Sequence, residues 1–146
     1  MITFEAELSV SSLEALIEKL DKYAKSLDEA TTDINKAIAE RGYDLVMKNV
    51  PVLTGELKNS IQSEYNSEYA RIYTDNEHAA YAEFGTGVVG KSKPHELADK
   101  NGWIYDYKNQ GWQGYVGRKY MYHSYITLKQ ELNGIAKDVL TRKELI

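Results

Sequence analysis

A phosphate-loop pattern is the clearest chemical signal in the sequence. Residues 85–92 read Gly-Thr-Gly-Val-Val-Gly-Lys-Ser, which is a glycine, four residues of any type, a second glycine, a lysine and a serine. In a nucleotide site the amides of such a loop hold phosphate groups, while Lys91 would neutralise their charge and the Ser92 hydroxyl would bind magnesium. Taken alone, the pattern predicts a nucleotide-binding enzyme.

The residues that follow the pattern argue against nucleotide chemistry. A true phosphate loop opens directly into a long helix that packs on a parallel sheet. Here Lys93 and Pro94 follow Ser92, and the next clear helical spacing starts near Tyr120. The remaining chain is also too short for several further strand-helix crossovers. We therefore expect a glycine turn that enters a loop, and nucleotide binding by residues 85–92 is the alternative.

Other side chains that could do chemistry are scattered. His78, His95 and His123 are not three or four residues apart, as metal ligands on one helix face would be. A metal-dependent nuclease cluster could be drawn from Asp75, Glu77, His78 and Glu83. Solvated acids along a sheet edge would give the same pattern. There is no cysteine, which excludes thiolate catalysis. We predict a protein that is not an enzyme, without catalytic residues, metal or cofactor.

Composition indicates one ordinary globular domain, residues 1–146. The chain has 22 acidic and 18 basic residues, and its net charge of -4 disfavours binding DNA through a broad basic surface. The N-terminus lacks a signal-peptide pattern, and no apolar stretch reaches the roughly 20 residues of a membrane span. We expect a protein made in the cytoplasm that contacts no membrane. Its 12 tyrosines against 2 phenylalanines favour assembly with other subunits.

The N-terminal third is predicted to be mainly helical. Residues 3–9 alternate apolar and polar side chains, which is typical of a half-buried strand. Apolar side chains then follow helical spacing from Leu13 to Leu27 and again from Ile34 to Val46. Because residues 31–33, Thr-Thr-Asp, favour caps and turns, we expect two helices or one kinked helix. Pro51 should end this element near Asn49.

The rest of the chain is predicted to form a small sheet and a closing helix. Residues 61–65 and 70–75 should pair as a hairpin across residues 66–68, and residues 79–84 should form another strand. Residues 88–117 are expected to be an extended insertion, in which residues 103–107 and 112–116 could form a projecting hairpin. Helical spacing returns from Tyr122 to Leu140 across Asn133 and Gly134. The expected fold class is α+β, with both helices packed on a mostly antiparallel sheet.

Two short segments should form turns. After Pro51, the Thr54 hydroxyl can cap the next helical turn and Gly55 tolerates backbone angles that a side chain resists. Leu57 and Ile61 are spaced to be buried together. In the second segment Gly85 and Gly87 permit a turn. Glu83, just before it, could be a buried cap for nearby amides or a solvated acid.

These two segments resemble the signatures of a known family. The first runs from Pro51 through Thr54, Gly55, Leu57 and Ser60 to Ile61. It is similar to the proline, threonine-glycine, leucine and serine-isoleucine signature of the gene-product-ten-like tail-component family of siphophages. The second includes Tyr81, Glu83, Phe84, Gly85 and Thr86. It is similar to that family's aromatic and Glu-Phe-Gly-Thr signature, and the two stand in the expected order.

The resemblance implies a structural virion protein, made in a bacterial host, of a tailed bacteriophage or prophage. It would belong to the neck and join head to tail, a step also called tail completion. Its expected partners are copies of itself in a ring, head-closure or connector proteins, and tail-terminator or tail-tube proteins. DNA would pass through the ring only as cargo. A generic adaptor of a prophage or secretion tube is a further alternative.

The insertion is our candidate for the contact with these partners. Exposed aromatic side chains beside basic residues are common interface anchors. The aromatic residues of this segment are Trp103, Tyr105, Tyr107, Trp112 and Tyr115. The alternative is that the insertion folds back on its own domain.

Overall fold

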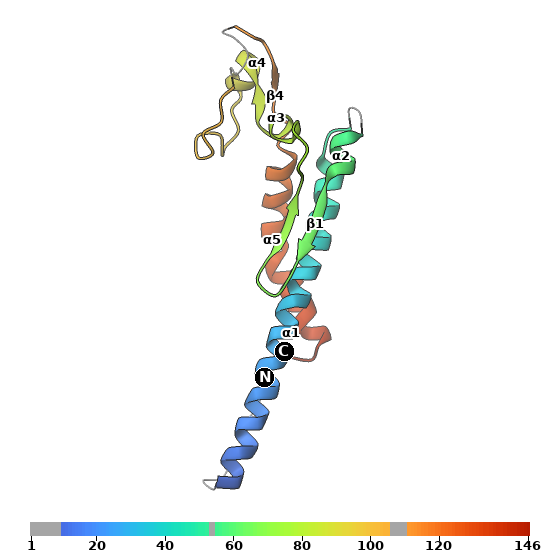
Figure 1. The fold of residues 1–146 in the computed structure, drawn as a ribbon, viewed down its shortest axis with the longest axis vertical. Helices are drawn as coiled ribbons and strands as arrows, with labels where there is room; N and C mark the ends of the chain where they lie inside the picture. Colours follow the sequence, from blue (N-terminus) through green and yellow to red (C-terminus); the bar gives the residue numbers. More distant parts are fainter. Residues whose placement is uncertain (1–9, 53–54, 106–110) are drawn as a thin grey trace.

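The computed structural model describes residues 10–52, 55–105 and 111–146. Its longest element is helix α1, Val10–Asn49, which runs through most of an elongated molecule. Helix α5, Tyr120–Arg142, and a two-stranded hairpin lie against the second half of α1 (Figure 1). A smaller lobe built from residues 79–117 lies at one end. The predicted α+β class, with two long helices and a small antiparallel sheet, is confirmed.

Helix α1 is continuous, so the prediction of two separate helices is wrong. At the suspected break the Thr31 Oγ1 hydroxyl donates to the Leu27 carbonyl at 2.9 Å. Thr32 makes the same kind of bond to the Asp28 carbonyl at 3.4 Å. Threonines that bond back one turn can remain inside a helix, because their hydroxyls no longer compete for other backbone groups. The helix ends at Asn49, as Pro51 predicted, while the strand predicted at residues 3–9 lies outside the described residues.

Helices α1 and α5 pack antiparallel and form the main body. Side-chain contacts join them along their length: Asp33 with Lys143 at 2.6 Å, Arg41 with Glu131 at 2.8 Å, and Asn49 with Ser124 at 3.0 Å. The centre of the core, at one end of this pair, consists of Val46, Val50, Ile61 and Tyr120. Gly42 makes room for the hairpin, since a Cβ there would lie 2.5 Å from Ile72 Cδ1. The absent side chain thus sets how closely the sheet approaches α1.

The predicted hairpin is confirmed. Strand β1, Gln62–Tyr65, pairs antiparallel with β2, Ala70–Tyr73, in a register that sets Gln62 opposite Tyr73. In the turn the Asn66 Oδ1 accepts the amides of Glu68 and Tyr69 at 2.8 and 3.0 Å. The Asn66 carbonyl accepts a hydrogen bond from Asn35 of α1 at 2.8 Å. The turn is therefore held both locally and by the long helix.

The corner between α1 and the hairpin contains the short helix α2, Glu56–Ser60. Gly55 precedes it with φ of +80°, a left-handed conformation that favours glycine, as predicted. Ile61 is buried in the core cluster and Leu57 packs against it, which confirms their shared burial. The Ser60 hydroxyl lies 2.6 Å from the Thr74 hydroxyl at the end of the hairpin. The cap predicted for Thr54 lies outside the described residues.

The lobe differs from the prediction in three ways. One is a short helix at residues 87–92, where a glycine turn that enters an extended loop was predicted. Residues 79–84 form a helix, α3, Ala79–Phe84, rather than a strand. Three of its six residues are alanine, the strongest helix former, and a short apolar run does not by itself distinguish the two structures. Strand β3 is Gly85–Thr86 and is followed by helix α4, Gly87–Ser92.

The projecting hairpin predicted within residues 103–116 is also wrong. Its second arm contains β4, Tyr115–Val116, which pairs antiparallel with β3 and not with the segment beginning at Trp103. Gly114 and Gly117 flank β4, where a Cβ would meet the backbone of Thr86 and of Glu83 and Phe84 respectively. The insertion is therefore anchored to the chain before it by close contact between backbones.

Gly134 offers a direct test of the helix α5 assignment. No atom of another element lies within 4 Å of a Cβ built at this position. Gly134→Ala should therefore raise the free energy of unfolding by about 1 kcal/mol through helix propensity alone. Urea unfolding followed by circular dichroism measures this change. Gly42→Ala is the control and should stabilise less, because its Cβ must displace Ile72; a loss of stability in Gly134→Ala would contradict the helix.

Candidate functional site

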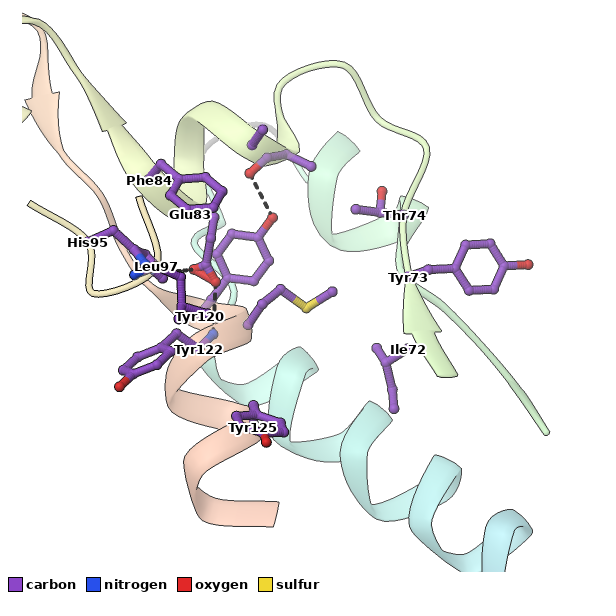
Figure 2. A pocket seen from close by; sticks show the side chains of 13 residues that line it. Ile72, Tyr73, Thr74, Glu83, Phe84, His95, Leu97, Tyr120, Tyr122 and Tyr125 are labelled. Atoms are coloured by element: carbon purple, nitrogen blue, oxygen red, sulfur yellow. Dashed lines mark hydrogen bonds and ion pairs between the residues drawn. The ribbon is translucent and has the colours of Figure 1, made fainter. Parts of the chain in front are cut away.

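The second motif meets the start of helix α5 through one buried carboxylate. Helix α5 begins after Lys119, whose φ is 51° and whose side chain makes no capping hydrogen bond. Glu83 of α3, only 6% exposed, points at this helix end (Figure 2). Its Oε1 accepts the Tyr122 amide at 2.8 Å, and the Met121 amide also donates to the carboxylate. Of the two roles open for Glu83, the structure shows the buried cap.

His95 lies beside this carboxylate and is itself buried. The Leu97 amide donates to its Nδ1 at 2.9 Å, so the proton of the neutral ring belongs on Nε2. That Nε2 faces the Glu83 Oε2 at 3.6 Å. Burial raises the pKa of Glu83, against the opposing effect of the Tyr122 and Met121 amides, and burial lowers the pKa of His95. Both shifts favour the uncharged forms of this buried pair.

Aromatic rings close the site from the side of the insertion. Trp103 stacks on Phe84 with ring centroids 5.0 Å apart and meets Tyr81 edge to face at 5.3 Å. Its Nε1 donates to the Gly85 carbonyl at 3.0 Å. The buried Tyr105 hydroxyl accepts the His95 amide at 2.9 Å. Trp103 thus joins the insertion to the second motif, whereas the Tyr105 hydroxyl bonds to His95 within the insertion.

The other predicted residues of the insertion are placed differently. Trp112 is partly buried, Tyr115 is 46% exposed, and Tyr107 lies outside the described residues. Thr86 is fully buried in β3, and within the described chain its hydroxyl has no hydrogen-bond partner. The structure therefore brings Trp103 and Tyr105 together with Phe84, while Tyr115 faces outward.

The amides of the phosphate-loop pattern are already bonded within the lobe. Those of Gly87, Val88 and Val89 donate to the carbonyls of Tyr105, Trp112 and Gln113 at 2.8, 2.8 and 2.9 Å. The Ser92 hydroxyl donates to the Val89 carbonyl at 2.6 Å. A phosphate group would need these same donors. Gly87 allows the backbone of the insertion to approach, since a Cβ there would lie 2.5 Å from the Trp112 carbonyl oxygen.

The acids and histidine considered for a nuclease cluster are not brought together. Glu83 is buried and turned toward α5, whereas the side chains of Glu77 and His78 are 88% and 69% exposed and face each other at 3.6 Å. Across residues 10–52, 55–105 and 111–146, no three histidine or acidic side chains are grouped as metal ligands would be. The pattern at residues 75–83 is therefore a solvated loop followed by one capping acid.

A cavity of about 430 Å³ opens beside the Glu83 carboxylate (Figure 2). Its walls are mostly apolar and include Ile72 of the hairpin, Met121 and Tyr125 of α5, and Phe84. Tyr120, 1% exposed, donates its hydroxyl to the Ala79 carbonyl at 3.0 Å, and burial raises the pKa of this phenol. The cavity lies where the lobe, the hairpin and α5 meet.

Comparison with protein families identifies the part of the chain that carries both motifs. Residues 14–85 match the family described as "Bacteriophage HK97-gp10, putative tail-component". These residues are similar to that family. The search of curated proteins and the search of solved structures each gave no match. The matched tail-component residues include most of α1, the Gly55 corner, the hairpin and α3, while α4, β4 and α5 follow the match.

The Glu83 cap crosses the boundary of the tail-component match. Glu83 lies inside the matched residues, and the helix end that it caps lies outside them. None of the described helices is both long enough and apolar enough to span a bilayer. The sequence did not predict that His95 would lie beside Glu83, because a single histidine has no spacing pattern that indicates a partner.

Loss of the Glu83 cap should destabilise the protein. Glu83→Ala leaves the Met121 and Tyr122 amides without an acceptor and should lower the free energy of unfolding by about 2 kcal/mol. Glu83→Gln keeps a carbonyl acceptor of the same length and should lose less than half of that. Chemical unfolding measures both, and hydrogen exchange of the Tyr122 amide reports on the bond itself. Equal losses in the two variants would contradict the cap.

The buried His95 should make stability sensitive to mild acid. Because its pKa is lowered in the folded protein, the unfolded chain takes up the proton first, and the contribution of the neutral ring is lost as pH falls below about 6.5. His95→Asn keeps an acceptor for the Leu97 amide but does not titrate. Wild type should be more stable than this variant at pH 7.5, and the difference should shrink toward pH 5. A constant difference would show that folding does not lower the pKa of His95.

Proposed function

We propose that the chain is a non-enzymatic structural protein of the phage particle that joins the head to the tail as part of the neck. The observation that carries this proposal is the tail-component match over residues 14–85. Two further observations support it: Glu83 serves as a helix cap, and the amides of residues 87–89 are bonded within the lobe. Glu83 and the phosphate-loop pattern, the two features that could have indicated catalysis or nucleotide binding, therefore have structural contacts.

The shape of the subunit suits a bridging role. The lobe and the first half of α1 lie at opposite ends of the elongated body (Figure 1), and both carry exposed apolar side chains. In the lobe these include Val88, Ile104 and Tyr115, which are 45%, 69% and 46% exposed. At the far end they lie on the first half of α1. Exposed apolar patches of this kind mark protein interfaces. A ring of such subunits would contact head-closure or connector proteins on one side and tail-terminator or tail-tube proteins on the other.

Joining requires that the lobe and the body move as one piece. The Glu83 cap fixes α3 to the start of α5, and Trp103 fixes the insertion to Phe84 and Gly85. A contact made by the lobe is therefore transmitted to α5 and α1. In this arrangement DNA passes through the ring without being read, and the net charge of -4 limits its adhesion to the wall.

A charge on the outer face of the lobe should block joining. In a phage that carries this gene, Ile104→Asp should give filled heads and free tails instead of complete particles, because a carboxylate cannot be buried unpaired in an interface. Electron microscopy of lysates counts the three species. Lys91→Ala is the matched control within the lobe and should leave joining intact.

Two further measurements, antibody labelling and nucleotide binding, separate the alternatives. Antibody against the protein should label the junction of head and tail, and a label along the tube or at the tail tip would contradict the neck position. If Lys91→Ala abolished joining and the wild-type protein bound ATP or GTP at millimolar concentration, the nucleotide-binding alternative would replace this proposal.

A further inference from the structure

The first half of α1 extends beyond every other described element (Figure 1). The contact of Asp33 with Lys143 marks the point where α5 ends. Ala30, just before it in α1, is still buried, whereas no residue from Leu13 to Glu29 is buried. An apolar stripe runs along this half and consists of Leu13, Ile17, Leu20 and Leu27, which are 48%, 57%, 46% and 38% exposed. This is a large apolar face for a helix to leave open.

The apolar stripe continues the seam that α1 uses inside its own subunit. The helical spacing of Leu13, Leu20 and Leu27 leads directly to Ile34 and Ile38, which are partly covered within the subunit. This helix face is apolar along its whole length, but only half of it is covered within the subunit. The exposed half is therefore suited to bind a second helix or a groove.

A groove on the same chain has matching chemistry. The α5 groove, of about 520 Å³, is lined by Ile38 and Val46 of α1, Ile72 of β2, and Tyr125, Leu128 and Leu132 of α5. It continues into the cavity beside Glu83, because Ile72, Met121 and Tyr125 line both spaces. From Met121 to Leu132 it follows α5 for about 17 Å at the helical rise per residue. The apolar stripe from Leu13 to Leu27 is about 21 Å long by the same measure.

The charges beside the two surfaces are also complementary. Glu14, Asp21 and Asp28 recur every seventh residue and therefore form an acidic row along one flank of the apolar stripe. Arg71 of β2 lines the α5 groove, where it also pairs with Glu64 at 3.1 Å and lies over the Tyr73 ring. On α5 itself, Lys129 is exposed one turn after Tyr125. A helix laid in the groove could place its acidic flank along the basic edge.

The stripe cannot fill the groove of its own subunit. Helix α1 is continuous, and Leu20 lies about 27 Å along its axis from Ile38, which already lines the groove. We infer that the apolar stripe of one subunit lies in the α5 groove of the next copy of this chain. Such a contact joins two different surfaces, and repeated contacts of this kind close into a ring when the rotation allows. The inference rests on the proposed ring and names the surfaces that build it.

Paired cysteines test this contact directly, because the natural chain has no cysteine. In the full chain, Leu20→Cys with Tyr125→Cys should give a ladder of dimers, trimers and larger species on a denaturing gel after treatment with a short bis-maleimide. Each single variant should stay monomeric, since each joins only to the other surface. The matched control is Lys22→Cys with Tyr125→Cys. Lys22 lies on the opposite face of α1, paired with Glu18 at 3.4 Å, and should give no ladder.

Other outcomes would overturn the contact in distinct ways. A dimer from Leu20→Cys alone would mean that two α1 stripes pair with each other. Slow reaction of that cysteine with a monofunctional maleimide in monomeric protein would mean that the chain covers its own stripe. If wild type forms rings by electron microscopy but the double variant gives no ladder, the surfaces are wrong and the ring stands. If neither rings nor ladder form, the proposed ring fails as well.

Discussion

A helix start needs acceptors for its first amides, and this requirement organises the structure around Glu83. Lys119 enters α5 in a left-handed conformation and supplies no side-chain acceptor, so the carboxylate comes from α3 instead. The cap fixes the direction of α5, which in turn places Tyr120 in the core and the helix along α1. His95 packs against Phe84 and Tyr122 beside this carboxylate. One polar contact therefore links the lobe, the core and the long helices.

The glycines of the lobe serve backbone contact rather than ligand contact. At Gly85 and Gly87 a side chain would collide with the backbone of residues 112–117, which returns across them to form β4. A nucleotide loop uses glycine for the same physical reason, since its backbone must come close to phosphate. Here the approaching group is another part of the chain. The resemblance to a phosphate loop thus arises because both structures require glycine where another group approaches the backbone closely.

Local patterns predicted the elements whose contacts lie nearby in the chain. Long apolar periodicity marked α1 and α5, and the alternating runs around Asn66 marked the hairpin. Residues 79–84 were misread because six residues carry too little periodicity to separate helix from strand. The pairing of β3 with β4 joins segments about thirty residues apart through two residues each, which no local pattern records. The sequence indicated only that Glu83 could cap a helix. It did not indicate which helix, because the contact with the start of α5 depends on how the whole lobe folds.

The unequal lengths of α1 and α5 create a gradient of stability within one helix. No residue of α1 from Leu13 to Glu29 is buried, and most helical stability in proteins comes from tertiary packing rather than from helix propensity. The free subunit should therefore fray from this end, while the part beside α5 stays folded. Ordering the frayed turns on assembly consumes conformational entropy, which weakens each single contact. Weak contacts between subunits can break and form again until a closed ring is complete. A misplaced subunit can therefore dissociate before the ring closes.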